Sequence, residues 1–308
     1  MIEKLSNAYA PSGREEEVRK IIIDELSDFY KEIKVDNIGN LVVHKPGKKK
    51  IIAITAPMDE VGFLVTHDEN EKIVNTASIG TVNQKALHNI VVKDENDNYY
   101  ISSKDNKISE DIARIRHFEF DKISGCKVDT LYNGLTSKTL IFDTKYRIVD
   151  SACVGKALER ALTCSVLLNL ARGLSDSLYE YYFIFTAYNN CDKKGAVTAT
   201  FDHKIDDLFN ICCIDADRYD LKLNEGPAVI LRDKLLVSSN DLAERIRSDK
   251  TLVTTDLVCE GGVFQKQPDT KNVVSLAIPV KNMYSPNEVA SMADIDRTYE
   301  LLYQAVLP

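Results

Sequence analysis

The stretch YYFIFTAYNNCDKKGAVTATFDHKIDDLFNICCID, residues 181–215, decides the fold class. It begins with an apolar run over 181–186 and ends with another over 210–215. Both runs are short and continuous, as buried strands are. Between them a helix-like segment begins near Gly195. This succession of strand, helix and strand is typical of a βαβ unit and predicts an α/β fold.

The sequence on either side supplies further strands. Residues 51–55 are apolar, β-branched and continuous, and they predict another buried strand. Two short runs on either side of the turn at 36–39 predict a β-hairpin over 33–44. Strands are also expected over 228–231, 252–257 and 273–278.

Helices are predicted at both ends of this body and within it. Ser12 and Glu15 have the spacing of a capping box, and the helix that follows them is predicted to run to about Lys31. Apolar residues recur at helical spacing from Asp150 to Gly173, and glycine is a suitable residue at a helix C-terminus. Shorter helices are expected from about 240 and over 293–306.

The composition changes between His67 and Asp143. Short strand-like runs are interrupted there by Asn and Asp, as in VVKDENDNYYIS at 91–102, and no long helical period is present. We therefore predict that 67–143 form an inserted β-rich domain, and that 1–66 and 144–308 together form the α/β body.

Charge and composition exclude several classes of protein. The 308 residues carry a net charge of −8, and Lys and Arg are scattered among more numerous acids, so nucleic acid is not an expected partner. No stretch approaches the roughly 20 apolar residues of a membrane-spanning helix. The acidic amino terminus does not resemble a signal peptide, so we expect a cytoplasmic protein without a membrane partner. The seven cysteines contain no C-x-x-C pair and are expected to be free thiols in a reducing compartment: Cys126, Cys153, Cys164, Cys191, Cys212, Cys213 and Cys259.

Polar residues follow several of the predicted strands. Each has an ordinary structural explanation when taken alone, as a helix cap, a turn residue or an aromatic residue on a rim. Together they predict a shared cleft, because the carboxyl ends of strands converge at one edge of an α/β sheet. The candidates are Asp59, Asp150, Asn189, Asn190, Asp215 and Tyr284.

Several segments resemble one known family. They follow the family's order along nearly the whole chain and are APSGREEEVR (10–19), VDNIGNLVV (35–43), APMDEVGFLV (56–65), FTAYNNCDKKGA (185–196), IDAD (214–217) and IPVKNMYSPNEV (278–289). The chain is similar to the tetrahedral and glutamyl aminopeptidases, which use two Zn or Co ions and are labelled endoglucanases in places. This resemblance implies a three-layer α/β/α sandwich with an inserted β-rich domain.

The resemblance also implies where the family's five metal ligands would lie. Asp150 and Asp215 match two carboxylate ligands that are retained. Pro57, Asn190 and Tyr284 replace a His, a Glu and a His, so three of the five ligands are lost. Proline offers no side-chain donor, an amide carries no charge, and a phenol with a pKa of about 10 is a poor zinc ligand.

The family's general base is a Glu, and the resemblance places Asn189 at its position. Asp59 matches the Asp that supports the first His ligand and remains as a remnant of the catalytic group. An amide does not accept a proton near neutral pH. Loss of a general base typically lowers a rate by 10² to 10⁴-fold.

Two carboxylates are too little negative charge to hold a pair of divalent cations. We therefore expect no cofactor, or at most one weakly bound divalent metal. A replacement set is the alternative, in which Cys191, Cys259 or Glu260 would coordinate a single metal together with Asp215.

The resulting prediction is a pseudo-peptidase that keeps the aminopeptidase fold and acts by binding peptides or by joining an assembly. The alternative is an active metallo-aminopeptidase that removes amino-terminal residues with an unorthodox metal site. The resemblance implies homo-oligomers, from dimers to dodecamers, with the inserted domain making subunit contacts. A hetero-oligomer with an active paralogue is a further possibility.

Overall fold

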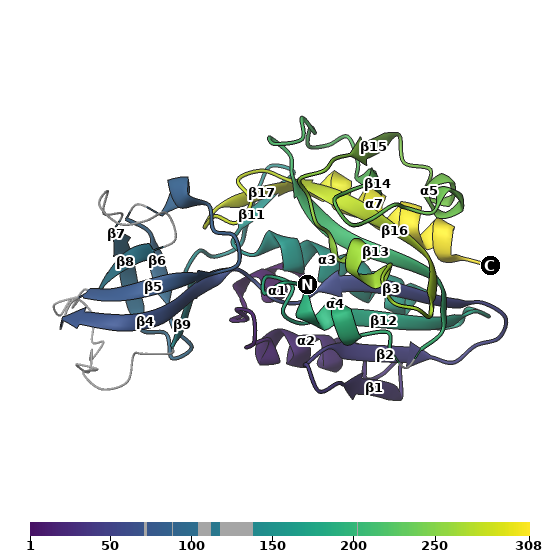
Figure 1. Ribbon diagram of the computed structural model, residues 1–308, viewed down its shortest axis with the longest axis horizontal. Coiled ribbons are helices and arrows are strands. Elements are labelled where there is room, and N and C mark those ends of the chain that lie inside the picture. The colour runs from purple at the N-terminus through teal and green to yellow at the C-terminus, as the bar shows by residue number, and fades with distance from the viewer. Residues whose placement is uncertain (71–72, 88, 104–111, 118–137, 202) are drawn as a thin grey trace.

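The computed structural model describes residues 1–70, 73–87, 89–103, 112–117, 138–201 and 203–308 (Figure 1). An eight-stranded sheet forms the centre of the body. In spatial order its strands are β1 (Glu32–Val35), β2 (Leu41–Lys45), β12 (Glu180–Thr186), β3 (Ile51–Pro57), β13 (Ile205–Asp215), β16 (Thr270–Val280), β14 (Ala228–Arg232) and β15 (Lys250–Val253).

The four central strands are parallel, so their carboxyl ends meet at one edge of the sheet. β12 pairs with β3 so that Thr186 lies opposite Pro57, and β13 pairs with β16 so that Asp215 lies opposite Val280. β1 and β2 form the antiparallel hairpin that the sequence predicts. The prediction of an α/β fold is confirmed.

Helices cover both faces of this sheet. One face packs against α1 (Ile2–Asn7), α2 (Glu16–Leu26), α3 (Leu158–Gly173), α5 (Asn240–Ile246) and α7 (Met292–Val306), and the other against the short helices α4 (Lys194–Thr198) and α6 (Glu260–Phe264). Side chains of β13 alternate between the two cores, because Phe209 and Ile211 join the first and Leu208 and Ile214 the second. The body is therefore a three-layer sandwich, as the resemblance implied.

A closed β-barrel leaves the body after β3 and projects from one side of it (Figure 1). Its core includes Phe63, Leu140 and Phe142. β4 begins at Gly62, earlier than the boundary predicted at residue 67. Around the barrel the strands are β4 (Gly62–Asn70), β5 (Ile73–Ile79), β8 (Ile112–His117), β7 (Tyr99–Ser103), β6 (Val91–Lys93) and β9 (Thr139–Phe142), with a single 3₁₀ turn at Gln84–Ala86. Cys126 lies outside the described residues.

The long helix does not begin at Asp150, so that prediction is wrong. A three-stranded sheet of β10 (Arg147–Val149), β11 (Ala152–Gly155) and β17 (Glu288–Ser291) precedes it. Asp150 lies in the exposed turn between β10 and β11 with φ +54°. The apolar residues of β11 fit a helical period by their spacing alone, but their backbone pairs with β17. α3 then begins at Leu158.

The first predicted helix differs at both of its ends. Ser12 donates to the Asp59 carboxylate, and Glu15 accepts from the backbone N–H of Gly13 at 2.7 Å, so the two residues do not form a capping box. α2 covers Glu16–Leu26 only. Both side chains form hydrogen bonds with residues outside α2. Glu15 also accepts from the backbone N–H of Tyr188 at 3.0 Å.

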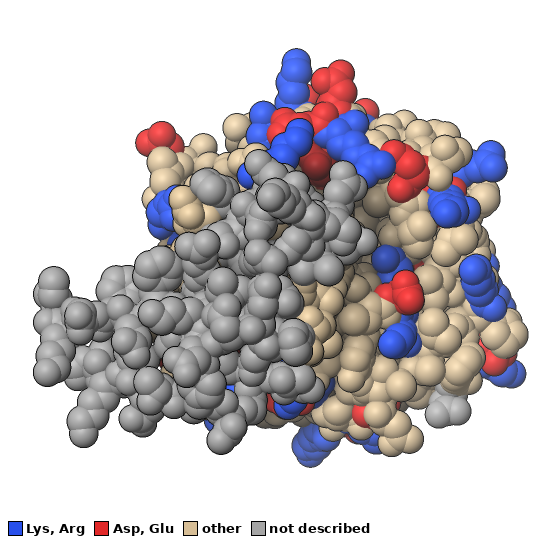
Figure 2. Space-filling view, turned by 60° about the vertical axis from the view of Figure 1, so that its left-hand side comes forward, with Lys and Arg blue, Asp and Glu red and all other residues tan. Residues whose placement is uncertain are grey.

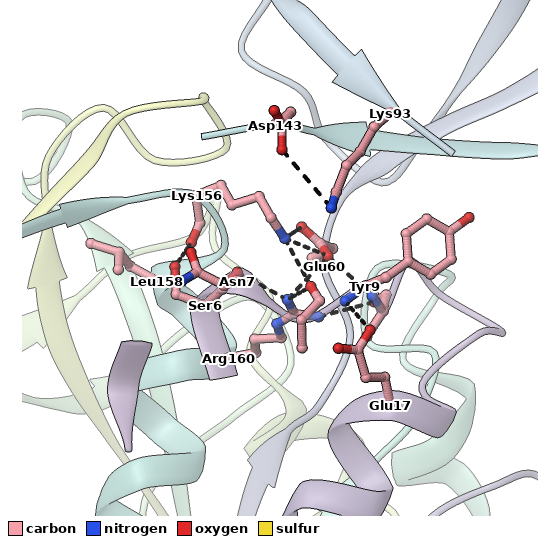
Figure 3. A network of polar contacts seen from close by, with 12 residues as sticks. Ser6, Asn7, Tyr9, Glu17, Glu60, Lys93, Asp143, Lys156, Leu158 and Arg160 are labelled. Carbon is pink, nitrogen blue, oxygen red and sulfur yellow. Dashed lines mark hydrogen bonds and ion pairs between the residues drawn. The ribbon is translucent and has the colours of Figure 1, made fainter. Parts of the chain in front are cut away.

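A buried ion network joins the end of β3 to α3 (Figure 3). The Glu60 carboxylate contacts Lys156 Nζ at 2.9 Å and Arg160 Nη2 at 3.1 Å, and all three side chains are almost fully buried. Lys156 Nζ also donates to the carbonyl of Ala8 at 2.9 Å. Burial lowers the pKa of Lys156 to about 8, and the positive charge of Lys93 in the barrel contributes to the shift.

On the face shown in Figure 2, Lys and Arg side chains of the described residues stand among Asp and Glu side chains, not in a continuous basic area. Within the part of the chain that the structure describes, every helix is too short or too polar to span a bilayer.

Candidate functional site

A cavity of about 330 Å³ opens where the central parallel strands end. Its wall contains Pro57 from the end of β3, Asn189 and Asn190 from the loop after β12, and Tyr284 from the loop after β16. The cleft predicted at this edge of the sheet therefore brings together three of its candidate residues, Asn189, Asn190 and Tyr284, with Pro57. They come from three segments that are far apart in the sequence.

Two of the proposed ligand positions do not line this cavity. Asp150 lies in the exposed turn between β10 and β11. Asp215 ends β13, is half-buried, and accepts from the backbone N–H of Asp217 at 3.1 Å. A turn stands at Asp150 in place of the expected helix start, and the β13 residues that line the cavity precede Asp215. The assignment of Asp150 and Asp215 as ligand positions stays a prediction.

Asp59 holds the loop that carries the two asparagines. Its buried carboxylate accepts from the backbone N–H of Asn189 at 3.0 Å, the backbone N–H of Asn190 at 2.8 Å and the Asn190 side-chain amide at 3.2 Å. Burial raises the pKa of Asp59, and these hydrogen bonds oppose the shift. Gly80 approaches this loop so closely that a Cβ there would lie 2.7 Å from Asn190 Cβ. The loop is therefore fixed from two sides.

Glu159 lies in the first turn of α3 and lines the cavity, and it is not among the site residues predicted from the sequence. Burial raises the pKa of its carboxyl to about 8, and the negative charges of Asp59 and Glu288 add to the shift. A helix start placed after Gly155 would have shown it as an acidic residue in the first turn, where acids are favoured.

Two further buried carboxyl groups, those of Glu260 and Glu288, belong to this part of the structure. Glu260 lines the cavity at the start of α6 and accepts from Thr186 Oγ1 at 2.8 Å, and burial raises its pKa to about 7. Glu288 accepts from the backbone N–H of Leu158 at 2.5 Å and of Tyr284 at 2.6 Å. Burial raises the pKa of Glu288 to about 7 as well. Glu288 therefore caps α3 and fixes the loop that carries Tyr284.

Lys193 supplies a positive charge at the cavity wall. It lies in the loop after β12 with φ +55°, in the left-handed region. Its charge opposes the rise in pKa at both Glu159 and Glu260. The sequence contained no signal for this role, because Lys193 lies in a run with another lysine and resembles an ordinary surface residue.

Three thiols also line the cavity. Burial raises the pKa of Cys259 to about 12 and raises the pKa values of Cys212 and Cys213 well above the ordinary value. Cys259 Sγ lies 3.2 Å from Ser275 Oγ. Without a bound metal these thiols are protonated at neutral pH, and a thiol in that state is a weak nucleophile.

The described residues do not fit a two-ion zinc centre. Zinc sites take three or four protein ligands. Among the residues that the structure describes, no group of three or more His, Cys, Asp or Glu side chains is placed to hold a metal ion. Cys259 and Glu260 from the alternative ligand set line the cavity, whereas Cys191 and Asp215 do not.

We expect Glu159→Gln to stabilise the protein at alkaline pH. The folded state keeps the Glu159 proton up to a pKa of about 8, whereas the unfolded chain releases it near 4.5, so stability from this group falls as pH rises between these values. Because one pKa unit corresponds to about 1.4 kcal/mol, the gain in the free energy of unfolding should be roughly 2–4 kcal/mol at pH 9.

Urea unfolding at pH 5 and pH 9 measures this difference, with Glu300→Gln as an exposed control. An equal gain for Glu159→Gln at both pH values would contradict the prediction.

Comparison with known proteins finds one family that this chain matches over most of its length. Residues 39–301 match the sequence model of a family described as M42 glutamyl aminopeptidase. A predicted aminopeptidase of Acetivibrio thermocellus is 26% identical over 338 aligned positions, which cover 99% of this chain and 97% of the relative.

Two solved structures have the same fold. An aminopeptidase from the archaeon Desulfurococcus kamchatkensis superposes with a TM-score of 0.86 at 19% identity. The match covers 98% of this chain and 92% of the archaeal chain. The TET1 peptidase of Pyrococcus horikoshii, which can assemble into a tetrahedron or a large octahedral shell, gives a TM-score of 0.81 at 21% identity, with 99% and 98% of the two chains covered.

Proposed function

Because the chain belongs to the M42 glutamyl aminopeptidase family, we propose that it is a non-catalytic member, a pseudo-peptidase that binds the amino termini of peptides without cleaving them. One observation carries the proposal. The cavity at the strand ends contains buried carboxyls that suit an ammonium group, while amides stand where the family resemblance expects a base and a ligand.

Hydrolysis of a peptide bond needs an activated water molecule. A bound metal lowers the pKa of water to about 7, and a general base takes its proton. The cavity offers Asn189 and Asn190 at the expected positions, and the Asn190 amide donates to Asp59. Neither amide accepts a proton near neutral pH. These residues therefore support binding without hydrolysis.

Binding of an amino terminus is supported by Glu159 and Glu260. Both line the cavity and have pKa values of about 8 and about 7. An α-ammonium with a pKa of about 8 placed beside them favours their ionised form. The resulting charge-assisted hydrogen bonds in a partly buried site are stronger than neutral ones.

We expect the protein purified without chelator to contain less than one metal ion per chain and to show no turnover of aminoacyl-anilides, with or without added Co²⁺. The physical reason is the missing ligand set and base. Elemental analysis and a peptidase panel measure both quantities, with an active family member assayed in parallel. About two Zn or Co ions per chain together with turnover would overturn the proposal.

One observation favours the alternative of an active metallo-aminopeptidase with an unorthodox metal site. Cys259 and Glu260 are adjacent in the sequence and both line the cavity. A single metal that binds there and supports turnover would establish this alternative. The same metal analysis therefore separates the two functions.

We further propose that the chain assembles into homo-oligomers, between a dimer and a dodecamer, through the inserted β-rich domain of residues 67–143. The assembly of the Pyrococcus horikoshii peptidase supports this proposal. Co-assembly with an active paralogue is an alternative that a pull-down from the native cell would identify. We also propose a cytoplasmic location, because the six cysteines among the described residues are free, as expected in a reducing compartment.

A further inference from the structure

A carboxyl group and an ammonium group line the cavity without a partner. Glu260 accepts from Thr186, and the Asp59 carboxylate is occupied by the asparagine loop. The Glu159 carboxyl and the Lys193 ammonium, by contrast, have no hydrogen bond and no ion pair with any residue that the structure describes. A charged group in a partly buried site is costly unless it is paired. Both groups are therefore available to a ligand.

Glu159 and Lys193 belong to different segments of the cavity lining and form no ion pair with each other. Glu159 is held by the first turn of α3, whereas Lys193 is held by the loop after β12, where its backbone N–H donates to the Asn189 carbonyl at 3.3 Å. The charge of Lys193 influences Glu159 and Glu260, yet it forms an ion pair with neither. The cavity wall therefore carries a carboxyl group and an ammonium group that do not form an ion pair with each other.

The loop that presents Lys193 adopts an unusual backbone conformation. Tyr188, Asp192 and Lys193 have φ values of +55°, +57° and +55°, in the left-handed region that residues other than glycine rarely occupy. Such conformations are energetically unfavourable and cluster at ligand-binding sites. The surrounding contacts thus hold Lys193 at the cavity at an energetic cost.

We propose that this cavity binds a small zwitterion, a free amino acid or a dipeptide, with Glu159 receiving the α-ammonium and Lys193 the carboxylate. The proposal rests on the amino-terminus binding proposed above and adds a contact for the other end of the ligand. A ligand with both charges satisfies the two unpaired side chains at once.

Size and spacing favour a short ligand. The cavity of about 330 Å³ is at the lower end of the range for small-molecule sites. Each added residue of an extended peptide moves its carboxylate about 3.5 Å farther from its ammonium. A long peptide would therefore leave Lys193 without its partner.

The test is calorimetric titration of the full-length protein with each of the twenty amino acids. The amino acid that binds best is then compared with its amide, its N-acetyl derivative and a dipeptide that begins with it. We expect the amide and the N-acetyl derivative to bind at least tenfold more weakly than the zwitterion. The comparison of the amino acid with the dipeptide identifies which of the two is the ligand.

Three variants assign the contacts. Lys193→Met should remove the preference for the free amino acid over its amide. Glu159→Gln should weaken the binding of both the amino acid and its amide. Lys194→Met is the matched control, because this neighbouring lysine is exposed and lies over the Tyr188 ring. Thermal unfolding of each variant shows that it is folded.

The contrary outcomes distinguish a failure of the Lys193 contact from a failure of the proposed function. Equal affinity of the wild-type protein for the acid and the amide, or an unchanged preference in Lys193→Met, would overturn the role of Lys193 but leave amino-terminus binding intact. Binding of no amine-bearing ligand, peptides with a blocked carboxyl end included, would overturn the proposed function itself.

Discussion

A variant that combines Pro57→His, Asn189→Glu, Asn190→Glu and Tyr284→His is expected to bind zinc with a dissociation constant below about 1 μM, equivalent to roughly −8 kcal/mol. All four positions line the same cavity as Glu159. The substitutions add two imidazoles and two carboxylates to that carboxylate, and zinc sites take three or four such ligands.

Elemental analysis and competition with a chromophoric chelator measure this gain. Zinc should also raise the unfolding temperature of the variant, because a ligand that binds the folded state stabilises it. The matched control is Pro57→Ala, Asn189→Gln, Asn190→Gln and Tyr284→Phe, which changes the same positions without adding a ligand. If the first variant bound no more zinc than this control, the assignment of these four positions from the family resemblance would be wrong.

Replacing Glu60 by leucine is expected to lower the free energy of unfolding by about 3–5 kcal/mol, because it leaves buried cations without their counter-charge. Glu60 contacts Lys156 Nζ at 2.9 Å and Arg160 Nη2 at 3.1 Å, as Figure 3 shows. Of these two cations, Lys156 is the one that can lose its proton, because burial already lowers its pKa to about 8. The variant should therefore release a proton from Lys156 near neutral pH.

Urea unfolding at pH 7 and pH 9 measures the loss, and it should be smaller at pH 9, where Lys156 is neutral. Glu300→Leu is the control, because its pair with Arg297 is exposed and is expected to contribute about 0–1 kcal/mol. A loss for Glu60→Leu no larger than that of this control would show that the network does not support the fold.

Much of the fold can be predicted from local patterns. The strands around 51–55, 181–186 and 210–215 form because their apolar residues are continuous, and the structure confirms them as parts of β3, β12 and β13. Pro57, Asn189 and Asn190 could also be placed at one cleft, because they lie at or shortly after the ends of strands that converge. The helix start at Asp150 failed because helical spacing does not reveal the pairing of β11 with β17.

The sequence by itself determined the α/β class, the family resemblance and the loss of histidines near the strand ends, because each depends on residue identity within a short segment. Only the tertiary structure decided that Glu159 and Lys193 face the cavity while Asp150 does not. Such placement depends on contacts between distant segments, as when Asp59 holds Asn190, 131 positions away. Hydrophobic periodicity is a local property, whereas the partner and charge environment of a polar side chain are set by the packing of the whole chain.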